Sequence, residues 1–283
     1  MNSGVILVNK PSGYTSRDIV NIYQKKLQTK KIGHCGTLDP LAKGVLVLCV
    51  GNATKLVPYL TSTRKQYLAK MQLGVLTTTC DLDGEVIEKS EINVSDEEIK
   101  KVFDNFPNTY IQEVPIYSAV KVNGKKLYEY ARAGEEVELP KRKVVIESLK
   151  LINIERVNNM IEIEFLCNVS KGTYIRSLCV DLAKELNTVA VMSNLVRVNQ
   201  GSFSIDECQN IEDEVCIIDI NKITFPYPRI DLKTIKDVKY GRSINNDSNY
   251  EGIVTLYYND ELIAFYESND DILKSKRGVK VWK

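Results

Sequence analysis

The sequence predicts an α+β fold, with a mixed, mainly antiparallel sheet in a large first domain and a small β-rich domain after it. The chain has 283 residues, of which 43% are hydrophobic and 27% charged, an ordinary mixture for a protein with a sizeable core. Helix and strand patterns do not alternate regularly, which argues against a parallel α/β sheet. A Pro226-x-Pro228 break precedes a segment with only strand patterns. We therefore expect domains at 1–224 and 225–283.

Helices are predicted where a capping residue precedes apolar residues at helical spacing. Thr15 or Ser16 caps a helix that runs to about Gln28, and Ser95-x-x-Glu98 is a capping box that opens a helix to Phe106. Further helices are expected at 53–60, at 125–132 and from 173 to 186.

Strands are predicted from alternating or short continuous apolar runs. They are expected at 5–9, 45–50, 66–73, 143–154, 160–168, 253–258, 262–267 and 279–282. Residues 31–44 are expected to form a glycine-rich loop and residues 107–123 to be irregular, while 188–198 is an apolar segment of undecided type.

Several classes of protein are excluded by what the sequence lacks. Its longest apolar run, 45–50, is far too short to span a membrane, and the N-terminal segment is expected to be a strand rather than a signal peptide. Seven cysteines without a CxxC motif indicate free thiols in a reducing cytoplasm. A single histidine, His34, excludes a histidine-based metal cluster, and neither a Walker A loop nor a GxGxxG motif occurs. We expect chemistry without a metal or cofactor.

The charge distribution is uneven although the net charge is only +1. Residues 1–70 hold eleven lysines and arginines but only two acidic residues, Asp18 and Asp39. This asymmetry indicates a basic face for phosphate groups. The alternative is that the lysines merely solvate a surface, and on charge alone both interpretations are equally supported.

Asp39 is the strongest candidate for a catalytic residue. It is the only carboxylate in a loop rich in glycine that leads into a buried strand, and Pro40 restricts it to extended backbone. Locally, a structural Asx-turn before proline is the more common role for such an aspartate.

Three weaker candidates lie elsewhere in the chain. Tyr174 and Arg176 lie two residues apart where a helix begins, and Arg176 is suited to holding a buried aspartate ionised. Tyr67 is suited to stacking on an unpaired base. Residues 115–132 are basic and aromatic, as in RNA-contacting segments. Each has a common structural alternative, namely a surface arginine, a core tyrosine or a solvated helix.

In combination, these motifs resemble those of the bacterial tRNA pseudouridine-55 synthases, the TruB family. The similarity extends from residue 5 to about residue 200 and is carried by VNKPSGYTS (8–16), GHCGTLDPLAKG (33–44), KQY (65–67), residues 115–134 and SKGTYIR (170–176). Two positions depart from the family pattern, since Asn9 stands where Asp is frequent and Cys35 where Thr is frequent.

The resemblance implies an isomerase that detaches the uracil of uridine 55 in the TΨC loop of tRNA, turns it and rejoins it through carbon 5. It implies a pseudouridine synthase domain at 1–224, with 115–134 as a flexible segment that closes on RNA, and a PUA-like RNA-binding domain at 225–283. Asp39 is then the essential carboxylate. The other implied roles are base stacking and proton movement for Tyr67, orientation of Asp39 for Arg176, base holding for Tyr174 and Leu195, entry into the T-loop for His34, and support beneath the pocket for Lys10 and Pro11.

The expected partner is tRNA, bound by a cytoplasmic monomer without a membrane or a small-molecule cofactor. Three alternatives remain open. The first is a guide-RNA-dependent synthase of the dyskerin type, and the second is a non-catalytic RNA-binding protein on the same fold. The third is a thiol enzyme that uses Cys35 beside His34.

Overall fold

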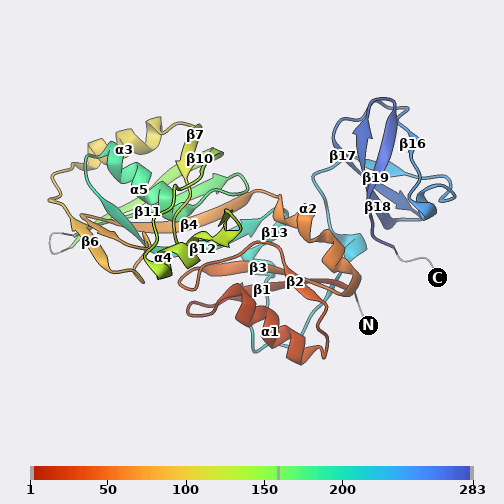
Figure 1. The fold of residues 1–283 in the computed structure, drawn as a ribbon, viewed down its shortest axis with the longest axis horizontal. Coiled ribbons are helices and arrows are strands. Elements are labelled where there is room, and N and C mark those ends of the chain that lie inside the picture. The colour runs from red at the N-terminus through yellow and green to blue at the C-terminus, as the bar shows by residue number, and fades with distance from the viewer. Residues whose placement is uncertain (1–2, 158–159, 281–283) are drawn as a thin grey trace. The chain divides into compact units, whose positions relative to one another are not determined.

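A computed structural model describes residues 3–157 and 160–280 (Figure 1). The chain divides into two compact units. One comprises Met1–Pro40, Gly44–Thr63 and Gly201–Lys283, and the other Leu41–Lys43 and Arg64–Gln200. No helix within the described ranges is long and apolar enough to cross a membrane.

The second unit is built on a five-stranded antiparallel sheet in the order β12-β4-β11-β10-β7. Its strands are β4 (Lys65–Leu73), β7 (Thr109–Glu113), β10 (Lys141–Val157), β11 (Met160–Val169) and β12 (Ala190–Gln200). Every second residue of β4 is buried, as expected for a strand with one face on the core. Helices α3 (Asp96–Asn105) and α5 (Ile175–Glu185) cover this sheet (Figure 1).

Smaller elements of the second unit form two hairpins and a short helix. One hairpin pairs β5 (Val75–Thr77) with β6 (Val86–Lys89), and the other pairs β8 (Lys121–Val122) with β9 (Lys125–Lys126). Helix α4 (Leu127–Ala133) follows and ends at Gly134, whose φ of +66° is the left-handed cap that glycine supplies readily.

The first unit begins with a small sheet and one capped helix. Strand β1 (Gly4–Lys10) pairs with β3 (Lys43–Val50) and with β14 (Ile218–Asp219), and β2 (Ile32–His34) pairs with β3. Thr15 and Asp18 form a reciprocal capping box at the start of α1 (Ser16–Lys26). The chain then passes through a 3₁₀ turn, Gly51–Leu56, into α2 (Val57–Thr61).

The C-terminal part of the first unit is a second, five-stranded sheet in the order β15-β17-β18-β19-β16. Its strands are β15 (Arg229–Asp231), β16 (Ile244–Asn245), β17 (Ile253–Tyr258), β18 (Glu261–Asn269) and β19 (Ile272–Gly278). Only the β15–β17 pair is parallel. The predicted α+β class with a small β-rich C-terminal part is thus confirmed.

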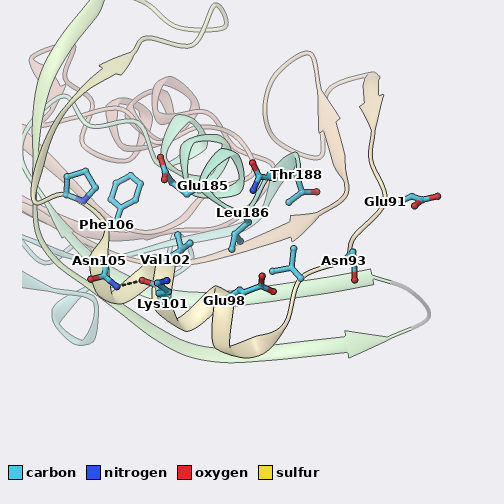
Figure 2. A pocket seen from close by; sticks show the side chains of 13 residues that line it. Glu91, Asn93, Glu98, Lys101, Val102, Asn105, Phe106, Glu185, Leu186 and Thr188 are labelled. Carbon is cyan, nitrogen blue, oxygen red and sulfur yellow. Dashed lines mark hydrogen bonds between the residues drawn. The ribbon is translucent and has the colours of Figure 1, made fainter.

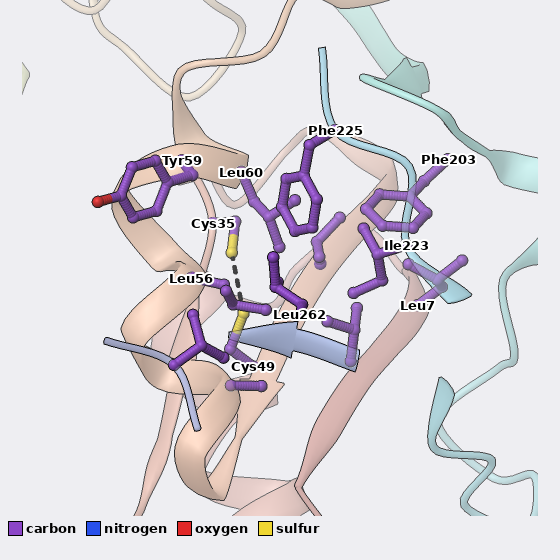
Figure 3. Packing of buried hydrophobic residues seen from close by; sticks show 14 of the residues in the cluster. Leu7, Cys35, Cys49, Leu56, Tyr59, Leu60, Phe203, Ile223, Phe225 and Leu262 are labelled. Carbon is purple, nitrogen blue, oxygen red and sulfur yellow. Dashed lines mark hydrogen bonds between the residues drawn. The ribbon is translucent and has the colours of Figure 1, made fainter. Parts of the chain in front are cut away.

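One apolar cluster joins this sheet to β1, β3 and α2 within the first unit (Figure 3). The ring of Tyr59 stacks on Phe265 with 3.7 Å between centroids, and Phe225 meets Phe265 edge-on at 5.1 Å. Aromatic pairs of this kind add to the free energy gained by burial.

Some expectations for individual segments differ from the structure, and the type of one undecided segment becomes clear. The loop predicted at 31–44 contains the short strand β2, and the irregular segment predicted at 107–123 contains β7. Strand β2 pairs with the longer β3, and β7 pairs with the longer β10. These pairings supply the order that the two short sequences do not encode. The undecided segment 188–198 forms most of β12. The last strand ends at Gly278 rather than covering 279–282, and residues 281 and 282 lie outside the described ranges.

Candidate active site

The loop that carries Asp39 is held on both sides of this residue. Before it, the Leu38 amide donates to Ser16 Oγ at 2.9 Å, and Ser16 lies at the start of α1. After it, the Pro40 carbonyl accepts from the Gly13 amide at 2.9 Å. Because both neighbours of Asp39 are anchored to the β1–α1 segment, its carboxylate stands on a fixed section of backbone.

Lys10 is the fully buried cation beneath this loop. Its Nζ donates to the carbonyl oxygens of Pro11 at 2.9 Å, Tyr14 at 2.6 Å and Pro40 at 3.2 Å. A buried ammonium requires such partners, and the third of them is the residue after Asp39. The structure thus brings Lys10 and Pro11 to the Asp39 loop, and the support beneath the pocket that the resemblance implies for them stays a prediction.

His34 ends β2, five residues before Asp39, and lies opposite Leu48 of β3. Cys35 continues this pairing through its amide, which donates to Val47 at 2.8 Å, and its side chain is fully buried. Its Sγ lies 3.4 Å from Sγ of Cys49 (Figure 3). The hydrogen bond with Cys35 and burial raise the pKa of the Cys49 thiol well above its usual value. A buried thiol facing another thiol is poorly placed as a nucleophile, which argues against the thiol-enzyme alternative.

In the second unit, Arg176 lies in the first turn of α5 with only 4% of its surface exposed. Its Nη1 donates to the Thr79 carbonyl at 2.9 Å and its Nη2 to the Tyr117 carbonyl at 3.1 Å. Its Nε lies 3.7 Å from Oδ2 of Asp81, which is also buried. These contacts fix the plane of the guanidinium.

Asp81 is a residue that the sequence analysis missed. Its carboxylate accepts from Thr79 Oγ1 and, at 3.2 Å, from the Asp83 amide. Locally the TTTCDLDG segment has only the composition of a turn. Its role as an ion-pair partner depends on α5, almost one hundred residues later in the chain.

Tyr67 and Leu195 lie on the same face of the sheet in the second unit. Tyr67 is opposite Arg197 in the β4–β12 ladder, and Leu195 is opposite Ala69, two residues further along β4. Tyr67 is 7% and Leu195 5% exposed, so both side chains are largely covered. Directly opposed residues share a face, which makes Tyr67 and Leu195 diagonal neighbours.

Tyr174 immediately precedes α5 and is half-buried. Its ring lies near the Arg142 guanidinium, with 5.6 Å between the guanidinium carbon and the ring centroid. Gln112 of β7, a second residue missed by the sequence analysis, contacts the Tyr174 backbone. The structure thus gathers Tyr67 and Leu195 on β4 and β12, and Tyr174 and Arg176 at the start of α5.

A cavity of about 640 Å³ in the second unit lies apart from all predicted site residues. It is lined by α3, the segment before it and the C-terminal end of α5 (Figure 2). Its lining includes the acidic residues Glu91, Glu98 and Glu185 and the apolar residues Phe106 and Leu186. None of the residues with a predicted role in catalysis or RNA binding contributes to this lining.

Metal chemistry has no evident site in the part of the chain that the structure describes. No three His, Cys, Asp or Glu side chains gather there in a group suited to hold a metal ion.

Comparison with known proteins relates the chain to RNA-modifying enzymes. Residues 24–175 match the model of the TruB family pseudouridylate synthase, N-terminal domain. A tRNA pseudouridine synthase B of Mesoplasma florum is 42% identical over 98% of both chains. Its namesake in Bacillus subtilis is 47% identical over 75% of this chain and 70% of its own.

A solved structure shows the same fold. The crystal structure of a Cbf5-Nop10-Gar1 complex contains a chain that is 25% identical with a TM-score of 0.75, and the match covers 98% of this chain and 85% of that one. The matched family model spans more than half of the sequence, and the Mesoplasma florum relative matches nearly all of it. On this evidence the chain belongs to the TruB family of pseudouridylate synthases.

Proposed function

We propose that the protein converts uridine 55 in the TΨC loop of tRNA to pseudouridine. The observation that carries the proposal is the anchored Asp39 loop in a chain 42% identical, over almost its whole length, to a tRNA pseudouridine synthase B. Two further relatives of that name are 48% and 38% identical. Relatives named for tRNA at these identities favour a tRNA enzyme over the guide-RNA-dependent alternative.

The reaction breaks the bond between ribose C1′ and uracil N1 and forms one between C1′ and C5. The proton on C5 leaves and N1 gains one, so nothing is oxidised or transferred outward and no redox partner is required. Asp39 either attacks as a nucleophile or removes a ribose proton to give a glycal. An intact Asp39 favours an enzyme over the non-catalytic alternative.

The proposal gives each other predicted residue a separate task. Tyr67 stacks on the uracil and assists proton movement, Tyr174 and Leu195 hold the base, and Arg176 orients Asp39. His34 enters the T-loop and helps to keep nucleotides extruded, which the chemistry requires because a stacked base conceals its glycosidic bond. The buried position of Tyr67 and the fixed guanidinium of Arg176 support these assignments.

Two further parts of the chain are proposed to contact RNA. The segment 115–134 carries lysines and tyrosines on β8, β9 and α4, and Lys126 Nζ donates to Tyr128 Oη at 3.0 Å. The C-terminal sheet of 225–283 is proposed as a PUA-like RNA-binding domain. We further propose that the enzyme acts as a cytoplasmic monomer.

One experiment tests the central proposal. Purified protein is incubated with an unmodified tRNA transcript, and pseudouridine is mapped by carbodiimide treatment and primer extension. Asp39→Asn is compared with Asp18→Asn, which removes the other carboxylate of residues 1–70 at an exposed helix cap. We expect a stop at position 55 with wild type and Asp18→Asn and none with Asp39→Asn. Near-normal product from Asp39→Asn contradicts the mechanism, and a wild type without product contradicts the function.

A further inference from the structure

Gln112 lies in β7 beside the residue that precedes α5, and its side chain is fully buried. Its Oε1 accepts from the Tyr174 amide at 2.8 Å, and its Nε2 donates to the Tyr174 carbonyl at 3.1 Å. Because the Tyr174 amide can only donate, these two contacts also fix which end of the Gln112 amide is oxygen. One side chain thus contacts both backbone polar groups of Tyr174, whose carbonyl also accepts from the Leu178 amide at 3.0 Å.

A third hydrogen bond holds the Gln112 amide in place. Its Nε2 also donates to Tyr110 Oη at 2.6 Å, and Tyr110 Oη donates to Asp181 Oδ2 at 3.1 Å. Burial, together with the charge of Asp181, raises the pKa of Tyr110, so its hydroxyl remains a donor at neutral pH. Since Asp181 lies on α5, the chain of bonds runs from the residue that precedes α5 to a residue on that helix.

Tyr174 needs such support because of its place in the chain. It has extended backbone, with φ −101° and ψ 117°, and its side chain makes no capping bond to α5. A rotation about this backbone would swing the tyrosine ring away from Arg142, which lies opposite Gln112 in the β7–β10 ladder. The bonds from Gln112 oppose that rotation.

We infer that Gln112 is a positioning residue for uracil binding, which sets the direction of the Tyr174 ring by holding the Tyr174 backbone. The inference rests on the proposed role of Tyr174 in holding the base. Glutamine suits this position because it combines an acceptor and two donors at the end of a long side chain. Asparagine is one methylene shorter, ionised glutamate has no donor, and methionine has similar length without a strong partner for the Tyr174 amide.

The first variant is Gln112→Met, with Tyr110→Phe as its matched control. Tyr110→Phe breaks the link to Asp181 but leaves both bonds between Gln112 and Tyr174. Single-turnover rates with excess enzyme report catalysis, and filter binding reports the Kd for tRNA. We expect Gln112→Met to slow the reaction at least about tenfold, because small displacements of reacting groups cost rate steeply. The Kd of this variant for tRNA should stay within a factor of about two of the wild-type value, because the change is confined to one pocket. Tyr110→Phe should keep most of the rate.

A double-mutant comparison separates positioning from general destabilisation. Tyr174→Ala removes the ring but keeps the backbone that Gln112 holds. If Gln112 acts through that ring, adding Gln112→Met to Tyr174→Ala should slow the enzyme little further. An undiminished loss in the Tyr174→Ala background overturns the inference, as does a Gln112→Met enzyme as fast as wild type.

A second variant, Gln112→Glu, covers the case in which Gln112→Met does not fold. A neutral carboxyl can accept from the Tyr174 amide and donate to its carbonyl, whereas the ionised form cannot donate. The groups facing it are Tyr110, Asp181 beyond that hydroxyl, and Arg142 from β10. The rate relative to wild type should fall as the pH rises and the carboxyl ionises. A ratio that does not change with pH overturns the inference.

Hydrogen exchange gives a readout that does not depend on activity. The Tyr174 amide should exchange faster in Gln112→Met and as slowly as wild type in Tyr110→Phe. Unchanged exchange overturns the proposed hold on the backbone even if the rate falls. If the Tyr174 amide exchanges faster in Gln112→Met but the wild-type protein makes no pseudouridine, the hold of Gln112 on this backbone is supported and the proposed function is refuted.

Discussion

Arg176 and Asp81 form a buried ion pair, with 3.7 Å between Nε and Oδ2 and side-chain exposures of 4% and 7%. The two terminal nitrogens of Arg176 donate to backbone carbonyls of Thr79 and Tyr117. Asp81 therefore supplies negative charge to a guanidinium that also donates to two neutral backbone carbonyls. Removing such charges from water is costly unless a partner of opposite charge compensates them.

Asp81→Asn should destabilise the protein and slow its reaction. Asparagine keeps the shape and an acceptor for Thr79 but removes a carboxylate charge that pairs with Arg176. Breaking a buried pair on one side costs about 3–5 kcal/mol, which urea unfolding should detect. The control is Asp83→Asn, an exposed aspartate two residues later. Equal losses of stability in the two variants would contradict a structural role for the pair.

Asp81 also illustrates what the sequence could not predict. The segment around it has hydroxyl, acidic and glycine residues, which indicate a turn but no partner. Gln112 was missed for a similar reason, since it lies in a polar segment that becomes a strand only by pairing with β10. Contacts made over long sequence separations leave no local pattern.

Elements with local signals were predicted well. The predicted capping box of Ser95 with Glu98 begins α3, and Thr15, one of the two caps expected for the first helix, begins α1. The alternation of β4 was also recognised, because its period of two is strict along the whole strand. For the site, motif resemblance predicts Asp39, Tyr67 and Arg176, whose roles stay predictions, whereas the residues that contact the Asp39 loop and the Arg176 guanidinium required the structure.

Arg176→Lys should lose most of the catalytic rate. The guanidinium uses separate nitrogens toward Thr79, Tyr117 and Asp81, and a lysine ammonium cannot reproduce this planar arrangement. We expect the single-turnover rate to fall at least about a hundredfold, which is the loss of rate that misplaced reacting groups cause. The affinity for tRNA should change little. Arg142→Lys is the control for loss of a guanidinium beside the same segment, and it should be the milder variant. Wild-type turnover in Arg176→Lys would refute the orienting role.

The buried cysteines should resist alkylation in the folded protein. Burial raises the pKa of the Cys167 thiol to about 12, so almost no thiolate is present at pH 8. Exposed Cys216 should react first with iodoacetamide, without loss of activity. Mass spectrometry of tryptic peptides locates the label, and rapid labelling of Cys35 with inactivation would revive the thiol-enzyme alternative.

The same thiol affects stability at alkaline pH. An unfolded cysteine loses its proton near pH 8.5, whereas folded Cys167 does so only at about pH 12. The folded state therefore binds the proton more tightly, and its contribution to stability is full below pH 8.5 and declines as the pH rises toward 12. Cys167→Val should lessen the decline of the unfolding free energy over this range, measured by urea titration.

His34 and Asp39 should differ in what their loss costs. His34 ends β2 on the same connection as Asp39, so both stand on anchored backbone yet are proposed to do different work. If His34 stabilises extruded nucleotides, His34→Ala removes only part of a flipping free energy of a few kcal/mol. The variant should be slower than wild type on folded tRNA and still clearly active.

On a short single-stranded substrate, whose uridine needs no extrusion, the defect of His34→Ala should shrink, because the step that His34 assists is absent. Asp39→Asn should remain inactive on both substrates, since its carboxylate is needed for the bond changes themselves. Single-turnover rates of the two variants on the two substrates make the comparison. Equal inactivity on the single-stranded substrate would mean that His34 takes part in the chemistry.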